Sequence, residues 1–204
     1  MTRCIMARQR LKLDDVDKQI IALLQENPSV SQAAIAKLLG ISQPAVGMRI
    51  KKLMKAGVLE TRVGIPAHRF NLRLAMVGIK TRNPDDLIKK FEKCPRLIFA
   101  SKAVGSYQLI LYFIGSCDRA LQNLIETRLS SDPNVLNFDV SLGDTPDSSA
   151  FIPLRIPKRL SQISPCGVEC STCPKYVDGR CLGCPASLLR KEKPVEDYIA
   201  QLIP

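Results

Sequence analysis

The chain has 204 residues, of which 46% are hydrophobic, only 5% are aromatic and none is Trp. This apolar content excludes wholesale disorder. No apolar stretch approaches the roughly 20 residues that span a bilayer, and no signal-peptide pattern opens the chain, so we expect a soluble, cytoplasmic protein without a membrane segment. The net charge is +11, and most of the excess of Lys and Arg over Asp and Glu falls within 1–73. A basic lobe of this kind is typical of proteins that bind a polyanion.

The segment 1–60 predicts three helices from the spacing of its apolar side chains. Pro28 ends the first helix, and Ser31 and Ser42 are suitable N-caps for the next two, with Gly40 in the turn between them. The predicted helices cover 14–26, 32–39 and 43–56. Two short helices joined by such a turn are typical of a helix-turn-helix domain, in which the last helix enters the major groove of DNA.

The outward face of the last helix is polar and basic, which favours DNA as the partner. Gln43 and Arg49 can bond to base edges, whereas the lysines and the start of the second helix can contact phosphates. The predicted DNA-binding residues are Ser31, Gln32, Ser42, Gln43, Ala45, Arg49, Lys51, Lys52 and Lys55. The alternative is a three-helix protein-interaction module with a solvated basic face.

About 45 positions of this region resemble, in register, the opening domain of the Lrp/AsnC (leucine-responsive/asparagine-type) transcription regulators. The matching residues are Leu13-Asp14, Asp17, Ile20-Ile21, Leu23-Leu24, Ser31, Ile35-Ala36, Gly40-Ile41-Ser42, Val46, Arg49-Ile50, Leu53 and Gly57-Val58-Leu59. The resemblance implies a winged-helix-like domain over 1–59 that binds double-stranded promoter DNA, and a regulator that is not an enzyme.

The next part of the chain predicts alternating strands and helices in the order βαββαβ. The predicted strands cover 74–80, 97–104, 107–114 and 135–142, and the predicted helices cover 84–93 and 118–129. This order is that of a ferredoxin-like fold, so the chain as a whole is expected to be α+β. It resembles the effector-binding and oligomerisation domain of the same family, which implies a domain over 74–143, a basic hinge strand over 60–73, and homodimers that assemble into tetramers or octamers.

The turn before the third of these strands departs from the family pattern. The family commonly has Gly, two residues and then Asp, whereas this chain reads Gly105-Ser106-Tyr107-Gln108. A neutral amide at Gln108 cannot pair with an ammonium group as Asp does. We therefore expect no standard amino-acid effector, and the four residues are either a pocket for another small molecule or a plain turn at an oligomer interface.

Five cysteines follow a linker predicted over 144–164, in the pattern C-x3-C-x2-C-x7-C-x2-C. Thiols at this density in a reducing cytosol favour a metal over disulfides. The candidate ligands are Cys166, Cys170, Cys173, Cys181 and Cys184. The last four suit a closed Zn2+ site, and the first three with Cys181 or Cys184 suit a [4Fe–4S] cluster. A dithiol switch without metal is the further alternative.

The cysteine-rich module, expected over 165–204 with a final helix over 194–203, has few large apolar residues between Ser161 and Pro185. We therefore expect a metal to order it, so that loss of the metal could switch DNA binding. The module is similar to short cysteine-rich segments attached to assorted proteins of anaerobic microbes.

The competing function is enzymatic, because siroheme decarboxylases share the two-domain architecture. Such enzymes are expected to use His and Arg in the sheet domain, whereas the single histidine, His68, lies in the hinge.

Overall fold

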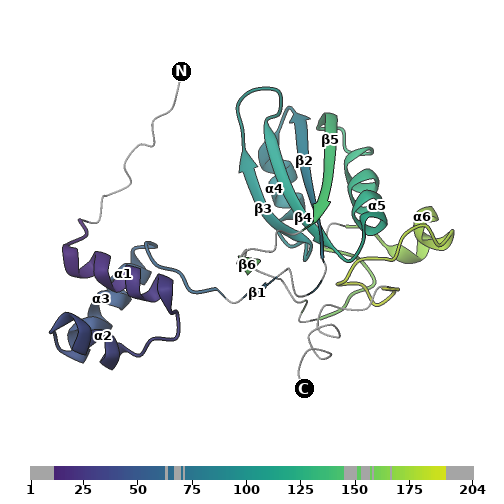
Figure 1. Cartoon of the computed structure of the whole chain (residues 1–204). Helices are drawn as coiled ribbons and strands as arrows, with labels where there is room; N and C mark the ends of the chain where they lie inside the picture. The colour runs from purple at the N-terminus through teal and green to yellow at the C-terminus, as the bar shows by residue number, and fades with distance from the viewer. Residues whose placement is uncertain are drawn as a thin grey trace. The chain divides into compact units, whose positions relative to one another are not determined.

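The computed structural model describes residues 12–62, 64–66, 70, 72–144, 151–152, 157, 159–165 and 167–191 (Figure 1). The chain divides into two compact units, Met1–Arg62 and Val63–Pro204. Predictions for His68, Cys166 and the helix over 194–203 concern residues outside the described part. Within the described part, no helix has the length and apolar character that crossing a membrane requires.

The first unit contains the three predicted helices. They are α1 (Asp15–Glu26), α2 (Gln32–Leu39) and α3 (Gln43–Lys55). Ile20, Ile35, Val46 and Leu53 are fully buried at the centre, so each helix contributes its apolar stripe to one small core. Residues 12–62 contain no β-strand, so the wing that the family resemblance implies is not seen among them.

The N-caps of α2 and α3 are the ones that the sequence predicts, and α1 has a further cap that the sequence analysis did not name. The hydroxyls of Ser31 and Ser42 accept hydrogen bonds from the backbone N–H groups three residues later, and Asp14 forms a capping box with Asp17. Gly40 ends α2 in the left-handed region, with φ of 65°, which a residue with a Cβ rarely adopts. The turn between α2 and α3 is therefore fixed by local chemistry.

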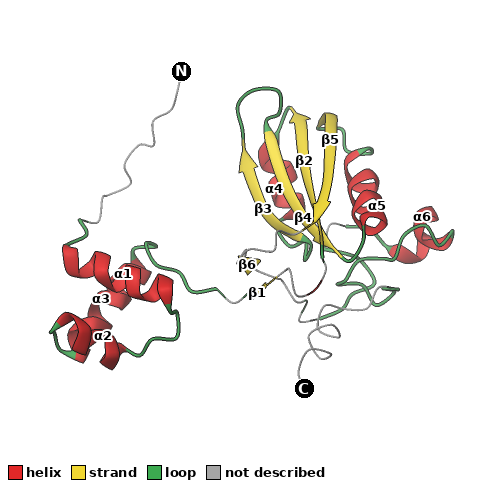
Figure 2. Cartoon of the chain, viewed as in Figure 1, coloured by secondary structure: helices red, strands yellow, loops and turns green. Residues whose placement is uncertain are grey.

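The second unit contains a four-stranded antiparallel sheet with both long helices on one face (Figure 2). The strands are β2 (Arg73–Thr81), β3 (Leu97–Lys102), β4 (Leu109–Gly115) and β5 (Val135–Asp144), and the helices are α4 (Pro84–Phe91) and α5 (Asp118–Leu129). The spatial order is β3-β4-β2-β5. This is the βαββαβ arrangement that the alternating pattern predicts.

The two faces of this sheet differ because side chains alternate along each strand. One face packs its residues against α4 and α5 in a core that includes Phe91, Phe113 and Leu121. On the other face, Phe99 is 57% exposed and Met76 is 38% exposed, and the Phe99 ring lies 6.0 Å from the ring of Tyr112. The sheet thus carries an apolar face that no described element covers.

The predicted hinge and linker pair with each other, which the sequence analysis missed. Within 60–73, β1 (Ile65–Pro66) pairs antiparallel with β6 (Phe151–Ile152) from the predicted linker 144–164. Further along, the module forms the short 3-10 helix η2 (Cys170–Thr172) and α6 (Pro174–Val177).

The cysteine-rich module packs on the sheet domain. Asn123 of α5 donates to the carbonyl of Arg180, and Lys175 forms an ion pair of 2.9 Å with Glu126 of α5. Arg96, before β3, lies 3.5 Å from the carbonyl oxygen of Gly183. The module therefore packs against α5 and its neighbours, whereas the sequence analysis expected only a metal to order it.

Candidate nucleic-acid interface and thiol-lined pocket

The outward face of α3 lies opposite its buried stripe. Val46 and Leu53 are fully buried, whereas Met48 is 67% exposed and Lys51 and Lys55 are exposed. These three exposed residues recur at positions i, i+3 and i+7, so they share one side of the helix. The face offers two ammonium groups to a polyanion and one apolar side chain that could contact a thymine methyl group.

The ends of α2 and α3 contribute polar groups to the candidate interface. Ser31, Gln32, Ser42 and Gln43 are exposed, while Ala45 is half-buried. The two serine oxygens already accept their capping bonds, so each hydroxyl retains its proton for donation to a phosphate. The structure therefore leaves these four side chains accessible at the helix N-termini, where backbone amides also favour an anion.

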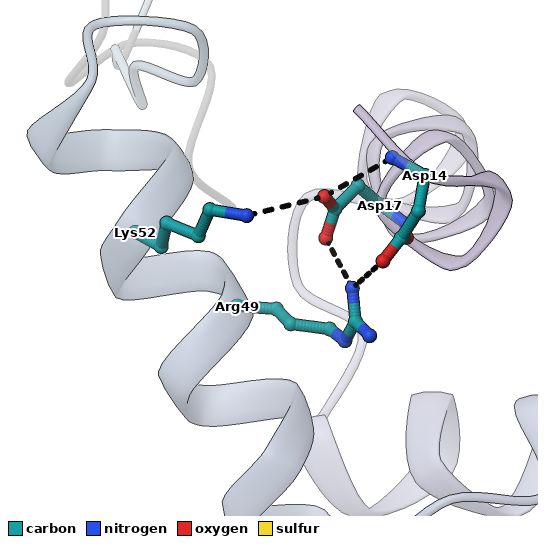
Figure 3. Close-up of polar contacts among 4 residues, drawn as sticks. All are labelled: Asp14, Asp17, Arg49 and Lys52. Atoms are coloured by element: carbon teal, nitrogen blue, oxygen red, sulfur yellow. Dashed lines mark hydrogen bonds and ion pairs between the residues drawn. The ribbon is translucent and has the colours of Figure 1, made fainter. Parts of the chain in front are cut away.

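Arg49 has a different setting, because it reaches from α3 to the start of α1 (Figure 3). Its Nη1 donates to Asp14 Oδ2 at 2.6 Å and to Asp17 Oδ1 at 2.7 Å. The Asp17 side chain is 0% exposed, and Lys52 Nζ lies 3.8 Å from its second oxygen. These contacts join the two helices. They form a cluster, here named the α1–α3 clasp, that consists of Asp14, Asp17, Arg49 and Lys52.

The clasp changes the acidity of its members. The Arg49 guanidinium, followed by the Asp17 backbone amide, holds the pKa of Asp14 below its ordinary value, and the two carboxylates raise the pKa of Arg49. A guanidinium held by two carboxylates is not free to turn toward a base edge. In this structure Arg49 therefore has a structural role, its prediction as a base reader stays a prediction, and Lys52 lies near the Asp17 carboxylate.

Met48 is the residue of this face that the sequence analysis missed. Each helical residue turns by about 100°, so Met48 lies opposite Val46 and Leu53, while Arg49 lies on the flank of that buried stripe. Helical phase alone is a signal that could have placed Met48 on the outward face.

The predicted effector loop is braced by its own side chains. Gln108 donates from Nε2 to the carbonyl of Gly105 at 3.1 Å, and its Oε1 accepts from the backbone N–H of Thr81 at 3.2 Å. Ser106 is exposed. Because one end of the Gln108 amide is bonded to the loop and the other to the end of β2, this residue acts here as a brace, and the prediction of a ligand site at this loop stays a prediction.

Tyr107 crosses the sheet instead of standing in a pocket. Its hydroxyl donates to Asp139 Oδ2 at 2.6 Å, which raises the pKa of the phenol. The ring lies where a Cβ on Gly78 would be, since such an atom would come within 2.8 Å of Tyr107 Cδ2. Gly78 is therefore required by the ring that covers it.

Gly78→Ala is expected to destabilise the sheet unit by about 1–3 kcal/mol, because the added methyl overpacks against the Tyr107 ring. In a Tyr107→Ala background the same change is expected to cost much less, since the ring is gone. Urea unfolding of the four proteins of this double-mutant cycle measures the coupling. Additive effects would show that the clash is absent in solution.

The four described cysteines of the module line one pocket. The pocket is lined by Cys170, Cys173, Cys181 and Cys184 together with Cys94 from the sheet domain. Cys94 is also a buried core residue. In the described part of the chain, no three Cys, His, Asp or Glu side chains have the arrangement of a metal site. No sequence signal pointed to Cys94 at this pocket, because it stands far from the other four.

Comparison with known proteins places both parts of the fold in one family. Residues 13–54 match the AsnC-type helix-turn-helix domain. The HTH-type transcriptional regulator LysM of Sulfurisphaera tokodaii is 31% identical over 118 residues, which cover 56% of this chain and 83% of that protein. An uncharacterized HTH-type transcriptional regulator of Pyrococcus horikoshii, PH0061, is 29% identical over 136 residues, which cover 64% of this chain and 92% of that protein.

Solved structures agree with the sequence comparisons. The crystal structure of PH0061 has a TM-score of 0.59 at 26% identity and covers 66% of this chain and 94% of that chain. The structure of E. coli AsnC has a TM-score of 0.56 at 18% identity and covers 65% of this chain and 92% of that chain, which shows a shared fold. On the helix-turn-helix match and the identity to LysM, the chain belongs to the Lrp/AsnC family of helix-turn-helix transcriptional regulators.

Proposed function

We propose that the protein binds double-stranded promoter DNA as a homodimer, with the outward face of α3 in the major groove. The observation that carries this proposal is the exposed row of Met48, Lys51 and Lys55, flanked by accessible capping serines. In this proposal the two lysines contact phosphates and Gln43, at the start of α3, reads a base edge. Lrp/AsnC-type relatives that are named transcriptional regulators support a regulatory role over an enzymatic one.

Dimerisation is proposed through the apolar face of the sheet. The face displays Phe99, Met76 and Tyr112 on three adjacent strands, and a second copy would bury the same residues across a two-fold axis. A two-fold dimer presents two copies of α3, so the DNA site is expected to be a pseudo-palindrome. Analytical ultracentrifugation distinguishes this dimer from the tetramer and octamer that the family resemblance implies.

The DNA-binding test uses the double variant Lys51→Glu/Lys55→Glu of the full chain. Its affinity for a random-sequence duplex at low salt is expected to fall by about 100-fold, and the slope of log affinity against log salt is expected to flatten by about 2, since two phosphate contacts are lost. Fluorescence anisotropy measures both quantities.

The matched control is Lys89→Glu/Lys93→Glu, which makes the same charge change on exposed residues at the end of α4 and just beyond it. This control is expected to stay within a few-fold of the wild type. An equal loss of DNA affinity in both variants would show that binding depends on net charge alone, and it would contradict the proposed α3 interface. Selection from the random pool should also yield a two-fold symmetric sequence, and a single unpaired half-site would contradict the dimer.

We further propose that the module binds Zn2+ or an iron–sulfur cluster through its cysteines and that this centre modulates DNA binding. The proposal is supported by four thiols on one pocket of a segment that packs against the sheet domain. Cys166, the fifth predicted ligand, lies outside the described residues. DNA affinity measured with and without the metal tests the modulation, and identical affinities in both states would contradict it.

A further inference from the structure

The thiol-lined pocket has two walls, one from the module and one from the sheet domain, mostly from α5. The module wall contains Cys170, Cys173, Cys181 and Cys184. The opposite wall includes Thr127 and Arg128. The module is fixed at this position by contacts of its own, such as the Lys175–Glu126 ion pair. The pocket is therefore a defined space between two packed surfaces.

The α5 wall holds unsatisfied donors. Among the described residues, only two buried side-chain polar atoms have no hydrogen-bond partner, and they are Thr127 Oγ1 and Arg128 Nε. Both residues line this pocket, and Arg128 is only 7% exposed. Buried polar groups in native proteins are almost always bonded, so an unpaired pair at one cavity indicates a partner that the cavity receives.

Charge limits what that partner can be. Arg128 is a permanent cation, and within the described part of the chain its side chain donates one hydrogen bond, 3.3 Å long, from Nη2 to the Ser164 hydroxyl, which does not neutralise it. Four thiolates around a divalent ion carry a net charge of about −2, and their sulfurs accept hydrogen bonds. A thiolate-ligated metal centre thus supplies both the negative charge and the acceptors that this wall lacks.

The thiols must move closer together to hold such a centre, because no three of the described ones already converge on one point. Metal sites commonly form as the ion draws its ligands together, so binding and ordering of the module are one event. The α5 wall is part of a regular helix and does not need to rearrange.

We propose that α5 completes the metal site of the module. Cys170, Cys173, Cys181 and Cys184 ligate the metal, and the Thr127 hydroxyl and Arg128 guanidinium donate hydrogen bonds to the ligating sulfurs. The inference rests on the proposed metal binding by the module, and it adds that the sheet domain, through these two positioning residues, sets the affinity of the centre. Metal binding is thereby coupled to the domain that is proposed to dimerise.

The test compares metal binding by the full chain carrying Thr127→Val, Arg128→Met or the control Arg119→Met, an exposed arginine on the same helix. The probes are Co2+ and Zn2+ under anaerobic conditions, and Fe2+ with sulfide in a parallel reconstitution. Tight Co2+ binding with thiolate charge-transfer absorbance identifies a single-metal site, whereas visible absorbance with stoichiometric iron and sulfide identifies a cluster. Thr127→Val and Arg128→Met are expected to weaken the centre by about 10–100-fold, and Arg119→Met by less than about twofold.

The stability of the metal-free protein distinguishes a role at the metal site from a role in folding. Thr127→Val removes an unsatisfied buried oxygen, so without metal it is expected to leave the Tm unchanged or to raise it. Arg128→Met removes the unsatisfied Nε together with the long hydrogen bond to Ser164, so without metal its Tm is expected to stay close to that of the wild type. Weaker metal binding by a variant that is no less stable cannot come from misfolding. Unchanged affinity in Thr127→Val and Arg128→Met would overturn the inference while leaving the module's metal site intact. If the wild type binds none of the probes, or Cys184→Ala binds them as the wild type does, the proposed metal function itself fails.

Discussion

Arg49→Met is expected to loosen the helical unit, lowering its Tm by at least about 10 °C. The reason is Asp17, whose side chain is 0% exposed and receives the Arg49 guanidinium at 2.7 Å. Methionine keeps much of the side-chain volume but leaves the buried carboxylate with only the Asp14 backbone N–H, 3.4 Å away, and the Lys52 ammonium, 3.8 Å away. An uncompensated buried charge is among the costliest single changes in a small domain.

Hydrogen–deuterium exchange of the full chain measures this effect unit by unit. Peptides from α1, α2 and α3 should exchange faster in Arg49→Met, while those from β2 to β5 serve as an internal reference. Lys55→Met, on the outward face of α3, is the control and should leave exchange unchanged. If Arg49→Met lost DNA affinity with unchanged exchange, Arg49 would be a base reader after all.

The same clasp gives the unit a pH dependence of known sign. The pKa of Asp14 is lowered in the folded state from its ordinary value of 3.8, so its stabilisation is complete above that value and is lost as the pH falls through the folded pKa. Arg49→Met removes the main cause of the shift. Acid titration of the two proteins should therefore show a shallower loss of stability below this pH in the variant.

Phe99→Glu is expected to convert the proposed dimer to a monomer, raising its dissociation constant by at least about 100-fold. The side chain is 57% exposed in the single chain, and in the proposed interface a carboxylate would replace a ring beside Tyr112. Burying an unpaired charge opposes association more than deleting the ring would. Loss of the dimer should also abolish selection of symmetric DNA sites.

Sedimentation velocity across a concentration series measures the dissociation constant. Val177→Glu places the same charge on an exposed apolar residue of α6 and should leave the dimer intact. A dimer that survives Phe99→Glu would show that copies associate elsewhere. Because Phe99 lies on the uncovered face, its replacement should leave the far-ultraviolet circular dichroism of the monomer native.

Much of the fold could be predicted from local patterns. Helix spacing and the capping residues Ser31 and Ser42 predicted α1 to α3 to within one residue at each end, and α5 was predicted in full. Alternation predicted all four main strands, with some ends off by one or two residues, because strand ends depend on the pairing partner and not on the local sequence alone. The pairing of β1 with β6 joins segments from opposite ends of the sheet unit's sequence, and nothing local to either segment predicts it.

The site was less predictable than the fold. Residue type suggested Arg49 as a base reader, but its partners Asp14 and Asp17 belong to a different helix and lie far from it in the sequence. Likewise, the cysteine spacing indicated a metal, while Thr127 and Arg128 carry no motif and become candidates only when the folded chain places them at the pocket. Motifs predict which chemistry is present, and tertiary packing decides which side chains surround it.

The two-residue ribbon of β1 and β6 has a mechanical consequence. Ile65 and Pro66 follow the helical unit along the chain, and Phe151 and Ile152 precede the module, so the segment that enters the sheet unit and the segment that leaves it are bonded side by side. Tension on the outgoing segment therefore reaches the incoming one directly, without passing through the sheet. A rearrangement of the module would in this way be transmitted, through backbone hydrogen bonds alone, to the segment that follows the helical unit.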